Sequence, residues 1–246
     1  MKKTMLTIFL GLSLMATNSF AQLSSKAMTD KLVKENPNLP VEEVVYIPEV
    51  KLYEIRLKNT SVLSYTNESV DFFLTAGEII DIKNKTSITN QRETANVKRF
   101  YKNLPFSTAI KVQYGKGSRS IAIFTDPDCP FCKSTDKEIH SKLNKSDLTV
   151  YYFMNPLNIP GHEQAPLKAS KIYCSPDRSK AWLNWMLNSQ LPDNPGTCTT
   201  PLAQHKKIAT DVNFNSTPII LFDNGYVFRG SITAPQITEL LNKKAP

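Results

Sequence analysis

The 246-residue chain has little glycine and histidine and only four cysteines. Eight glycines exclude a collagen-like or glycine-rich architecture. The three histidines, His140, His162 and His205, lack the spacing of metal ligands, so we expect them at the surface and predict no metal site. A helix that spans a bilayer needs about 20 apolar residues in a row, and no apolar run after the amino-terminal segment is that long. We therefore predict no membrane insertion.

Charge of one sign is also in modest excess. The net charge is +8, and no long run of lysine and arginine carries it, so we predict no nucleic acid as a partner. Hydrophobic residues make up 41% and charged residues 21% of the chain, values of an ordinary globular protein. The length allows one or two domains with a sizeable core.

Residues 1–21 have the three parts of a signal peptide. Lys2-Lys3 give the charged region, Met5 to Met15 the apolar region, and Ser19-Phe20-Ala21 a small-x-small cleavage site. A membrane anchor is the alternative, but the apolar run is too short for one. We therefore expect a soluble product exported to a bacterial periplasm, where disulfides persist.

Residues 22–86 contain no cysteine and have mostly β character, which predicts a small α+β domain. Its sheet would leave edge strands open, and edge pairing between two copies is a common route to a homodimer. The predicted elements are a polar helix at Ser24–Glu35 and strands at Glu42–Pro48, Leu52–Lys58, Ser61–Tyr65, Phe72–Thr75 and Glu78–Ile82, with turns at Asn67-Glu68-Ser69 and Ala76-Gly77.

Residues 87–105 interrupt the β pattern. Asn90 to Asn103 is polar and compatible with a helix, and Pro105 ends it. An ordinary surface helix is one interpretation. A linker helix is the better one, because the character of the sequence changes on either side of it.

Residues 106–246 predict an α/β domain in which the elements follow a thioredoxin-type order, β-α-β, helices and β-β-α, with a helical insertion. The turn Asp223-Asn224-Gly225 is a strong hairpin signal. The predicted elements are strands at Ile110–Tyr114, Ser120–Phe124, Leu148–Met154, Ile219–Phe222 and Tyr226–Phe228, a helix after Cys129, a mostly helical stretch at Glu163–Leu191 with Trp182 and Trp185 in the core, a helix at Leu202–Val212 with Thr200 as its N-cap and Pro201 as its first residue, and a terminal helix from Ala234 through Leu241.

The four cysteines allow three pairings. Cys129 and Cys132 form a local Cys-x-x-Cys pair, which leaves Cys174 and Cys198 for a structural disulfide. A zinc site is an alternative, but the second pair lacks the two-residue spacing. A purely structural local disulfide is another, against which Pro130-Phe131 after a strand end argues.

A Cys-x-x-Cys at the start of a helix favours ionisation of its first thiol. The first thiol faces unpaired backbone N–H groups and the positive end of the helix dipole, which stabilise its thiolate. Cys129 is therefore the predicted nucleophile and the more exposed, lower-pKa thiol, and Cys132 the thiol that resolves the mixed disulfide. Thr217-Pro218 stands where, in a thioredoxin-type order, a cis-proline packs against the cysteines and its neighbouring backbone pairs with an extended substrate.

The chain resembles the DsbC/DsbG family of periplasmic disulfide isomerases. The resemblance rests on the run from Phe124 through Cys132, on Thr217-Pro218 and on the pair Cys174 and Cys198. It implies a cystatin-like N-terminal dimerisation domain at 22–86, a linker helix at 87–105, and a thioredoxin-like catalytic domain at 106–246. In this family the dimer is V-shaped, and its cleft holds unfolded substrates.

The resemblance implies an isomerase or reductase of wrong disulfides in exported proteins, with no cofactor and with a DsbD-like membrane reductase as its electron donor. Pro130-Phe131 is similar to the Pro-Tyr of DsbG-like members, although Phe131 lacks the tyrosine hydroxyl. Thr217 is similar to the isomerase pattern, whereas DsbA-like oxidases have valine there. Two alternatives are a DsbG-like reductase of sulfenylated cysteines and a holdase chaperone with secondary redox activity.

Overall fold

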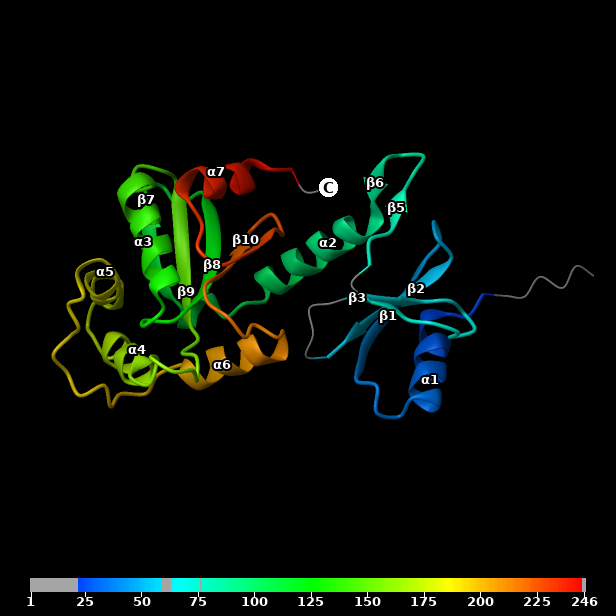
Figure 1. Cartoon of the computed structure of the whole chain (residues 1–246), viewed down its shortest axis with the longest axis horizontal. Coiled ribbons are helices and arrows are strands. Elements are labelled where there is room, and N and C mark those ends of the chain that lie inside the picture. Colours follow the sequence, from blue (N-terminus) through cyan, green and yellow to red (C-terminus); the bar gives the residue numbers. More distant parts are fainter. Residues whose placement is uncertain (1–21, 59–62, 76, 245–246) are drawn as a thin grey trace, which may run out of the picture.

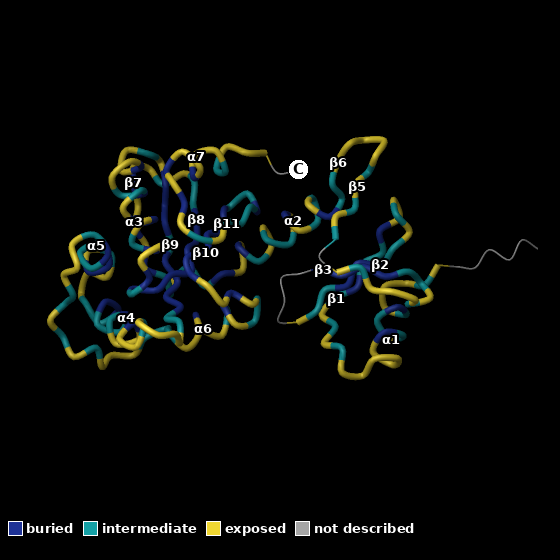
Figure 2. The backbone as a smooth tube through the Cα atoms, in the orientation of Figure 1, coloured by how far each residue is buried: buried dark blue, intermediate teal, exposed yellow. Residues whose placement is uncertain are grey.

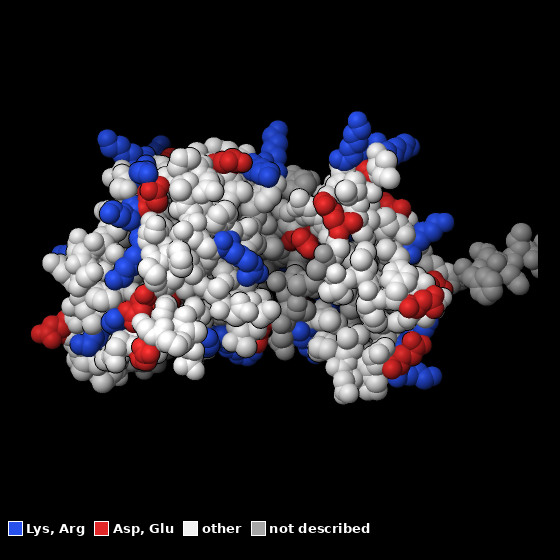
Figure 3. Space-filling model, in the orientation of Figure 1, with Lys and Arg blue, Asp and Glu red and all other residues white. Residues whose placement is uncertain are grey.

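The computed structural model describes residues 22–58, 63–75 and 77–244. The predicted signal peptide lies outside these residues, as do the start of the predicted strand Ser61–Tyr65 and Ala76 of the predicted turn. The chain forms two lobes, and helix α2 (Ile88–Lys102) runs from one to the other (Figure 1). Among the described residues, no helix is long and apolar enough to cross a membrane. Lysine and arginine are interspersed with aspartate and glutamate on the face in Figure 3.

The N-terminal lobe is a helix packed on a four-stranded antiparallel sheet, as predicted. The Ser24 side chain accepts a hydrogen bond from the Ala27 amide over 3.2 Å and so caps the helix. Met28 and Leu32, one turn apart, are buried in one cluster with Tyr53 and Ile55 of the sheet. The elements are α1 (Ser25–Glu35), β1 (Val41–Ile47), β2 (Leu52–Leu57), β3 (Leu63–Thr66) and β4 (Leu74–Thr75), and the strands are arranged β1-β2-β3-β4.

The predicted hairpin between Phe72–Thr75 and Glu78–Ile82 is wrong. Instead, β5 (Ile80–Asp81) pairs with β6 (Thr86–Ser87) in a separate two-stranded ribbon. The Asp81 carboxylate accepts hydrogen bonds from the amide and side chain of Asn84, which closes the ribbon's turn. This ribbon leads directly into α2 and so extends the β pattern beyond the predicted boundary.

Helix α2 begins two residues earlier than predicted, because the Ser87 hydroxyl caps it through the Asn90 amide at 3.1 Å. Its first half is tied to the N-terminal sheet by Arg92, which donates to the buried carboxylate of Glu54. Its last turn packs on the other lobe, where the Tyr101 hydroxyl donates to Ser120 Oγ over 2.8 Å. The helix is therefore held at both ends.

The C-terminal lobe is built on a five-stranded sheet of order β11-β10-β8-β9-β7, in which only β8 and β9 are parallel. The predicted order of elements is confirmed. After a single 3-10 turn at Phe106–Thr108 come β7 (Ile110–Tyr114), β8 (Arg119–Thr125), α3 (Pro130–Lys142), β9 (Leu148–Met154), α4 (Ala165–Tyr173), α5 (Arg178–Asn188), α6 (Leu202–Asp211), β10 (Ile219–Phe222), β11 (Val227–Arg229) and α7 (Ala234–Asn242).

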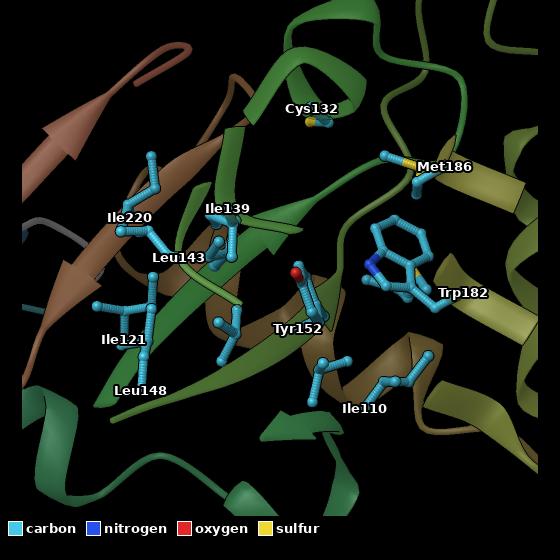
Figure 4. Close-up of a cluster of buried hydrophobic side chains, with 14 of the residues drawn as sticks. Ile110, Ile121, Cys132, Ile139, Leu143, Leu148, Tyr152, Trp182, Met186 and Ile220 are labelled. Atoms are coloured by element: carbon cyan, nitrogen blue, oxygen red, sulfur yellow. The ribbon is translucent and has the colours of Figure 1, made fainter. Parts of the chain in front are cut away.

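Both faces of this sheet are covered, and its central strands β8, β9 and β10 are mostly buried (Figure 2). Side chains alternate between the faces along each strand. Ile121 and Ile123 join a cluster with α3, α5 and α7, part of which Figure 4 shows. Ala122 and Phe124 join a second cluster with the last turn of α2 and with α6. The linker helix thus supplies part of one layer of the C-terminal lobe.

Three predictions in this lobe need correction. Trp182 is fully buried, but Trp185 is only partly buried, because its indole N–H reaches the Pro127 carbonyl oxygen at 2.7 Å beside the active-site loop. Helix α6 begins at Leu202, the first residue of the predicted range, but its N-cap is Pro201 rather than the predicted Thr200.

The third correction concerns the histidines, which were expected at the surface. His205 is fully buried, and its Nε2 lies 2.9 Å from Thr108 Oγ1. Burial lowers the pKa of His205 to about 4, so it packs as a neutral ring. His140 and His162 are half-buried.

Candidate active site

Cys129 stands at the start of α3, directly after the loop that leaves β8. It is the N-cap residue, and Pro130, whose fixed φ and missing N–H suit the first helical position, follows it. The Cys129 amide donates to the carbonyl oxygen of Asp126 over 3.2 Å, which fixes the loop. Its thiol therefore lies at the positive end of the helix dipole.

Cys129 and Cys132 are free thiols, and both are buried. Cys129 is 4% exposed and Cys132 1% exposed, so Cys129 is the more exposed of the two, as predicted. A hydrogen bond from Cys132 is the largest cause that lowers the pKa of Cys129 to about 6, and backbone groups of the first helical turn add to it. Burial, and then the neighbouring sulfur, raise the pKa of Cys132. At neutral pH, Cys129 is thus the thiolate and Cys132 the thiol.

Thr217 and Pro218 lie against Cys129, and the peptide bond between them is cis. When it is protonated, the Cys129 thiol donates to the Thr217 carbonyl oxygen over 3.4 Å. The sheet brings these distant segments together, because β8 and β10 are neighbours with Phe124 opposite Ile219. The loop after β8 and the loop before β10 therefore meet at one end of the sheet.

Exposed apolar side chains lie on the segments that contact the active-site loop. Phe131, between the two cysteines, is 61% exposed. Ile159 and Leu167, in the loop after β9 and in α4, are also exposed. The next residue of α4, Lys168, pairs with Asp128 of the active-site loop. Large apolar groups this close to a reactive thiol suit contact with unfolded chain.

Trp185 adds an aromatic ring with two ammonium groups over it. Lys133 Nζ lies 4.5 Å and Lys168 Nζ 4.8 Å from the ring centroid. The indole is held by its bond to Pro127, two residues before Cys129. The tryptophan thus packs against the rim of the site.

Two site residues, Asp126 and His162, escaped the sequence analysis as a pair. The fully buried Asp126 carboxylate accepts from the amides of Asp128 and Leu157, each at 2.7 Å, and from Nδ1 of His162 at 2.8 Å. The hydrogen bond to Asp126 is the largest cause that raises the pKa of His162. The available signal was topological, because loops that follow neighbouring parallel strands emerge at the same sheet edge.

Asp136 is a buried carboxylic acid one turn beyond Cys132 in α3. Tyr152 and Trp182, which pack together in Figure 4, are its polar neighbours. Within hydrogen-bond distance, neither Asp136 oxygen has a partner among the described residues. Burial raises the pKa of Asp136 to about 7. No pattern in the sequence indicates that this acidic residue faces the core.

The remaining cysteines form the disulfide Cys174–Cys198. It joins the end of α4 to the loop before α6 and encloses α5. Within the ranges that the structure describes, no group of three or more histidine, cysteine, aspartate or glutamate residues is arranged to hold a metal ion.

Comparison with known proteins matches residues 106–245 to the family model described as a thioredoxin-like domain. A probable thiol:disulfide interchange protein DsbC of Bordetella pertussis is 30% identical over 187 residues, which cover 76% of this chain and 63% of that protein. The thiol:disulfide interchange protein DsbC of Dickeya dadantii is 29% identical over 110 residues, 45% of this chain and 44% of that protein.

The chain thus spans less than two thirds of the length of these curated relatives. Among solved structures, a disulfide interchange protein from Neisseria gonorrhoeae is 38% identical with a TM-score of 0.53, over 58% of this chain and 99% of that one.

Proposed function

Since the chain belongs to the thioredoxin-like domain family and has DsbC thiol:disulfide interchange proteins among its relatives, we propose that it isomerises or reduces non-native disulfides in exported proteins. The observation that carries this proposal is the position of the Cys129 sulfur, at the start of α3 and 3.4 Å from the Thr217 carbonyl oxygen. A low thiol pKa beside a backbone segment that can hold a peptide is what attack on a protein disulfide requires.

The chemistry proceeds by two alternative routes from one intermediate. The Cys129 thiolate attacks a substrate disulfide, that S–S bond breaks, a Cys129–substrate disulfide forms, and the released substrate thiolate takes up a proton. In isomerisation, another substrate thiolate attacks the mixed disulfide and leaves Cys129 reduced. In reduction, Cys132 attacks Cys129 instead, the second substrate sulfur leaves as a thiol, and the protein is oxidised by two electrons.

The substrate would lie along the segment before β10. Thr217 precedes the strand, so its backbone would pair with an extended peptide next to Cys129, whereas the Pro218 carbonyl oxygen already accepts from the Gly230 amide over 2.9 Å. Phe131, which offers no hydrogen bond, and Pro130 complete the Cys-Pro-Phe-Cys site. Recognition would then rest on backbone pairing and apolar contact, which suits many different unfolded substrates.

The proposed chemistry needs no metal or organic cofactor, because the sulfur atoms carry the electrons. Each reduction consumes the Cys129–Cys132 dithiol, and a DsbD-like membrane reductase is the proposed donor that restores it. A signal peptide at 1–21 would deliver the protein to the periplasm, where Cys174–Cys198 would serve as a structural disulfide.

The proposed division is a cystatin-like dimerisation domain at 22–86, a linker helix at 87–105 and the catalytic domain at 106–246. Exposed apolar side chains support an interface with a second copy on the N-terminal lobe, since large apolar groups at a surface often mark interfaces. They are Phe72, Phe73, Ile80 and Ile82.

The same exposed groups favour holdase chaperone activity as a second candidate function, and reduction of sulfenylated cysteines by Cys129 would draw on the same thiolate. The variant with both Cys129→Ala and Cys132→Ala separates thiol chemistry from holdase chaperone activity. It should lose exchange and sulfenic-acid reduction, and it should still suppress aggregation of an unfolded protein if apolar contact alone is responsible.

Reactivation of scrambled, multi-disulfide ribonuclease tests the proposal, beside a glutathione redox titration of the same protein. The full chain should restore ribonuclease activity, Cys129→Ala should not, and the titration should report one exchanging dithiol. Equal rates with the wild type and Cys129→Ala would overturn the proposal.

A further inference from the structure

The loops that follow the two parallel strands of the catalytic sheet are joined by a buried ion pair. Asp126 comes directly after β8, and His162 lies in the loop after β9, the strand that pairs with β8 and lies beside β8 in Figure 1. Nδ1 of His162 lies 2.8 Å from Oδ2 of Asp126, and the side chains are 12% and 0% exposed. A carboxylate only accepts, so Nδ1 is the donor.

Asp126 is also bound to the nucleophile. Its carbonyl oxygen accepts from the Cys129 amide over 3.2 Å, while its carboxylate accepts from the Asp128 amide and from His162. The residue that holds the imidazole therefore also fixes the loop that carries the thiol. Asp126 and His162 are 36 positions apart in the sequence, and only the parallel register of β8 and β9 brings them together.

The charged groups around His162 are mostly negative. The active-site loop contributes Asp126, Asp128 and the Cys129 thiolate, and each of them raises the pKa of His162, the hydrogen bond to Asp126 most. On its own segment, Glu163 is an exposed neighbour. Helix α4 contributes Lys168, whose ammonium pairs with Asp128. This balance favours the imidazolium form.

We propose that His162, held by Asp126, is a positioning residue that keeps a positive charge beside the Cys129 thiolate and thereby makes that thiol reactive in mildly acidic solution. The inference rests on the proposed role of Cys129 as the attacking sulfur. Only the S–H bond of Cys129 breaks in this ionisation, its proton passes to solvent, and His162 keeps its own.

Two observations support a direct charge effect. Phe131, the residue next to Pro130 within the Cys-x-x-Cys segment, brings neither charge nor a hydrogen-bond donor on its side chain. The Cys129 thiolate is among the causes that raise the pKa of His162, and because such coupling is reciprocal, we expect the imidazolium to favour the Cys129 thiolate. The charged side chain that Phe131 does not provide is thus supplied by His162, from the loop after β9.

The effect of His162 on the Cys129 thiolate depends on pH. His162 is charged below its raised pKa, so the thiolate is stabilised in acidic solution, and the effect fades as pH rises through that pKa. With a pKa of about 6, Cys129 is almost fully a thiolate above pH 8, so loss of the imidazolium charge should change its reactivity little there. A lost charge should therefore slow the thiol only on the acid side.

The test is the rate of Cys129 alkylation from pH 5 to 9 in the reduced full chain, with His162→Gln against the matched control His140→Gln. Glutamine keeps a donor for Asp126 without the charge, and His140 lies at the far end of α3. His162→Gln should react about three- to tenfold more slowly at pH 5.5 and equally fast at pH 8.5, and His140→Gln should match the wild type.

Equal rates for His162→Gln and the wild type at pH 5.5, or an equal loss at every pH, would overturn the inference. A wild type without a reactive thiolate below pH 7 would contradict both this inference and the proposed function. A second measurement needs no variant at His162: its NMR titration in the wild type should shift to lower pH once Cys129 is alkylated, and an unchanged titration would contradict the charge effect.

Discussion

The sulfur of Cys129 lies 3.4 Å from the carbonyl oxygen of Thr217, although 88 positions separate the two residues. The pairing of β8 with β10, with Phe124 opposite Ile219, sets this contact. The thiol is thus presented at the backbone of the segment that we propose as the peptide-binding site. Attack and substrate binding share one end of one sheet.

The pKa difference between the two thiols predicts which one reacts. In the reduced protein, the rate of Cys129 alkylation should rise with pH to half its maximum near pH 6 and level off above pH 7. Cys132, whose pKa is raised, should remain unmodified at pH 7. Peptide mapping by mass spectrometry checks this, and preferential labelling of Cys132 would reverse the assignment.

Asp136 predicts a loss of stability with rising pH. Its pKa is raised from 3.8 to about 7 in the folded chain, so the folded state holds the proton more tightly, and the free energy of unfolding falls as pH rises from about 4 to 7. Asp136→Asn should stabilise the protein by roughly 2–4 kcal/mol at pH 8 and by little at pH 3.5. Urea unfolding at both values measures this, and an equal effect at both would count against a buried, titrating carboxyl.

The close contact of Gly225 with α2 predicts that the hairpin between β10 and β11 holds the linker helix in place. The φ of Gly225 is +96°, and a Cβ there would lie 2.3 Å from the carbonyl oxygen of Thr94 in α2. Gly230 is the matched control, with a φ of +97° and nothing within 4 Å of a Cβ. Gly230→Ala should cost about 1 kcal/mol and Gly225→Ala at least roughly twice that. Limited proteolysis should cut α2 faster only in Gly225→Ala, and equal behaviour of the two variants would contradict the docking.

The exposed phenylalanines predict the site of self-association. The full chain should be a dimer by light scattering at micromolar concentration, and the Phe72→Ser, Phe73→Ser double variant should be a monomer. Val33→Ser, at an exposed apolar position on α1, should remain a dimer. A monomeric wild type would refute the dimer, and a dimeric double variant would move the interface elsewhere.

The order of elements in the C-terminal lobe could be predicted, because buried strands, a capped helix and a hairpin turn each leave a local signal. The contact between Cys129 and Thr217 followed from that order. The β5–β6 ribbon could not be predicted, since a strand of two residues has no detectable alternation.

Other features depend on packing rather than on pattern. His205 faces the core at a position where composition favoured the surface, and Asp136 does the same in α3. The pairing of Asp126 with His162 depends on the parallel register of two strands, which is a tertiary property. Contacts of this kind can be identified only from the assembled tertiary structure.

The most direct test of the central claim is to trap the mixed disulfide. Cys132→Ala removes the resolving thiol. The variant, incubated with scrambled ribonuclease, should therefore accumulate a covalent complex that dithiothreitol reduces. Mass spectrometry should place the link at Cys129, and Cys129→Ala should form no complex. A complex linked through any other cysteine, or none under conditions where the wild type restores ribonuclease activity, would contradict attack by Cys129.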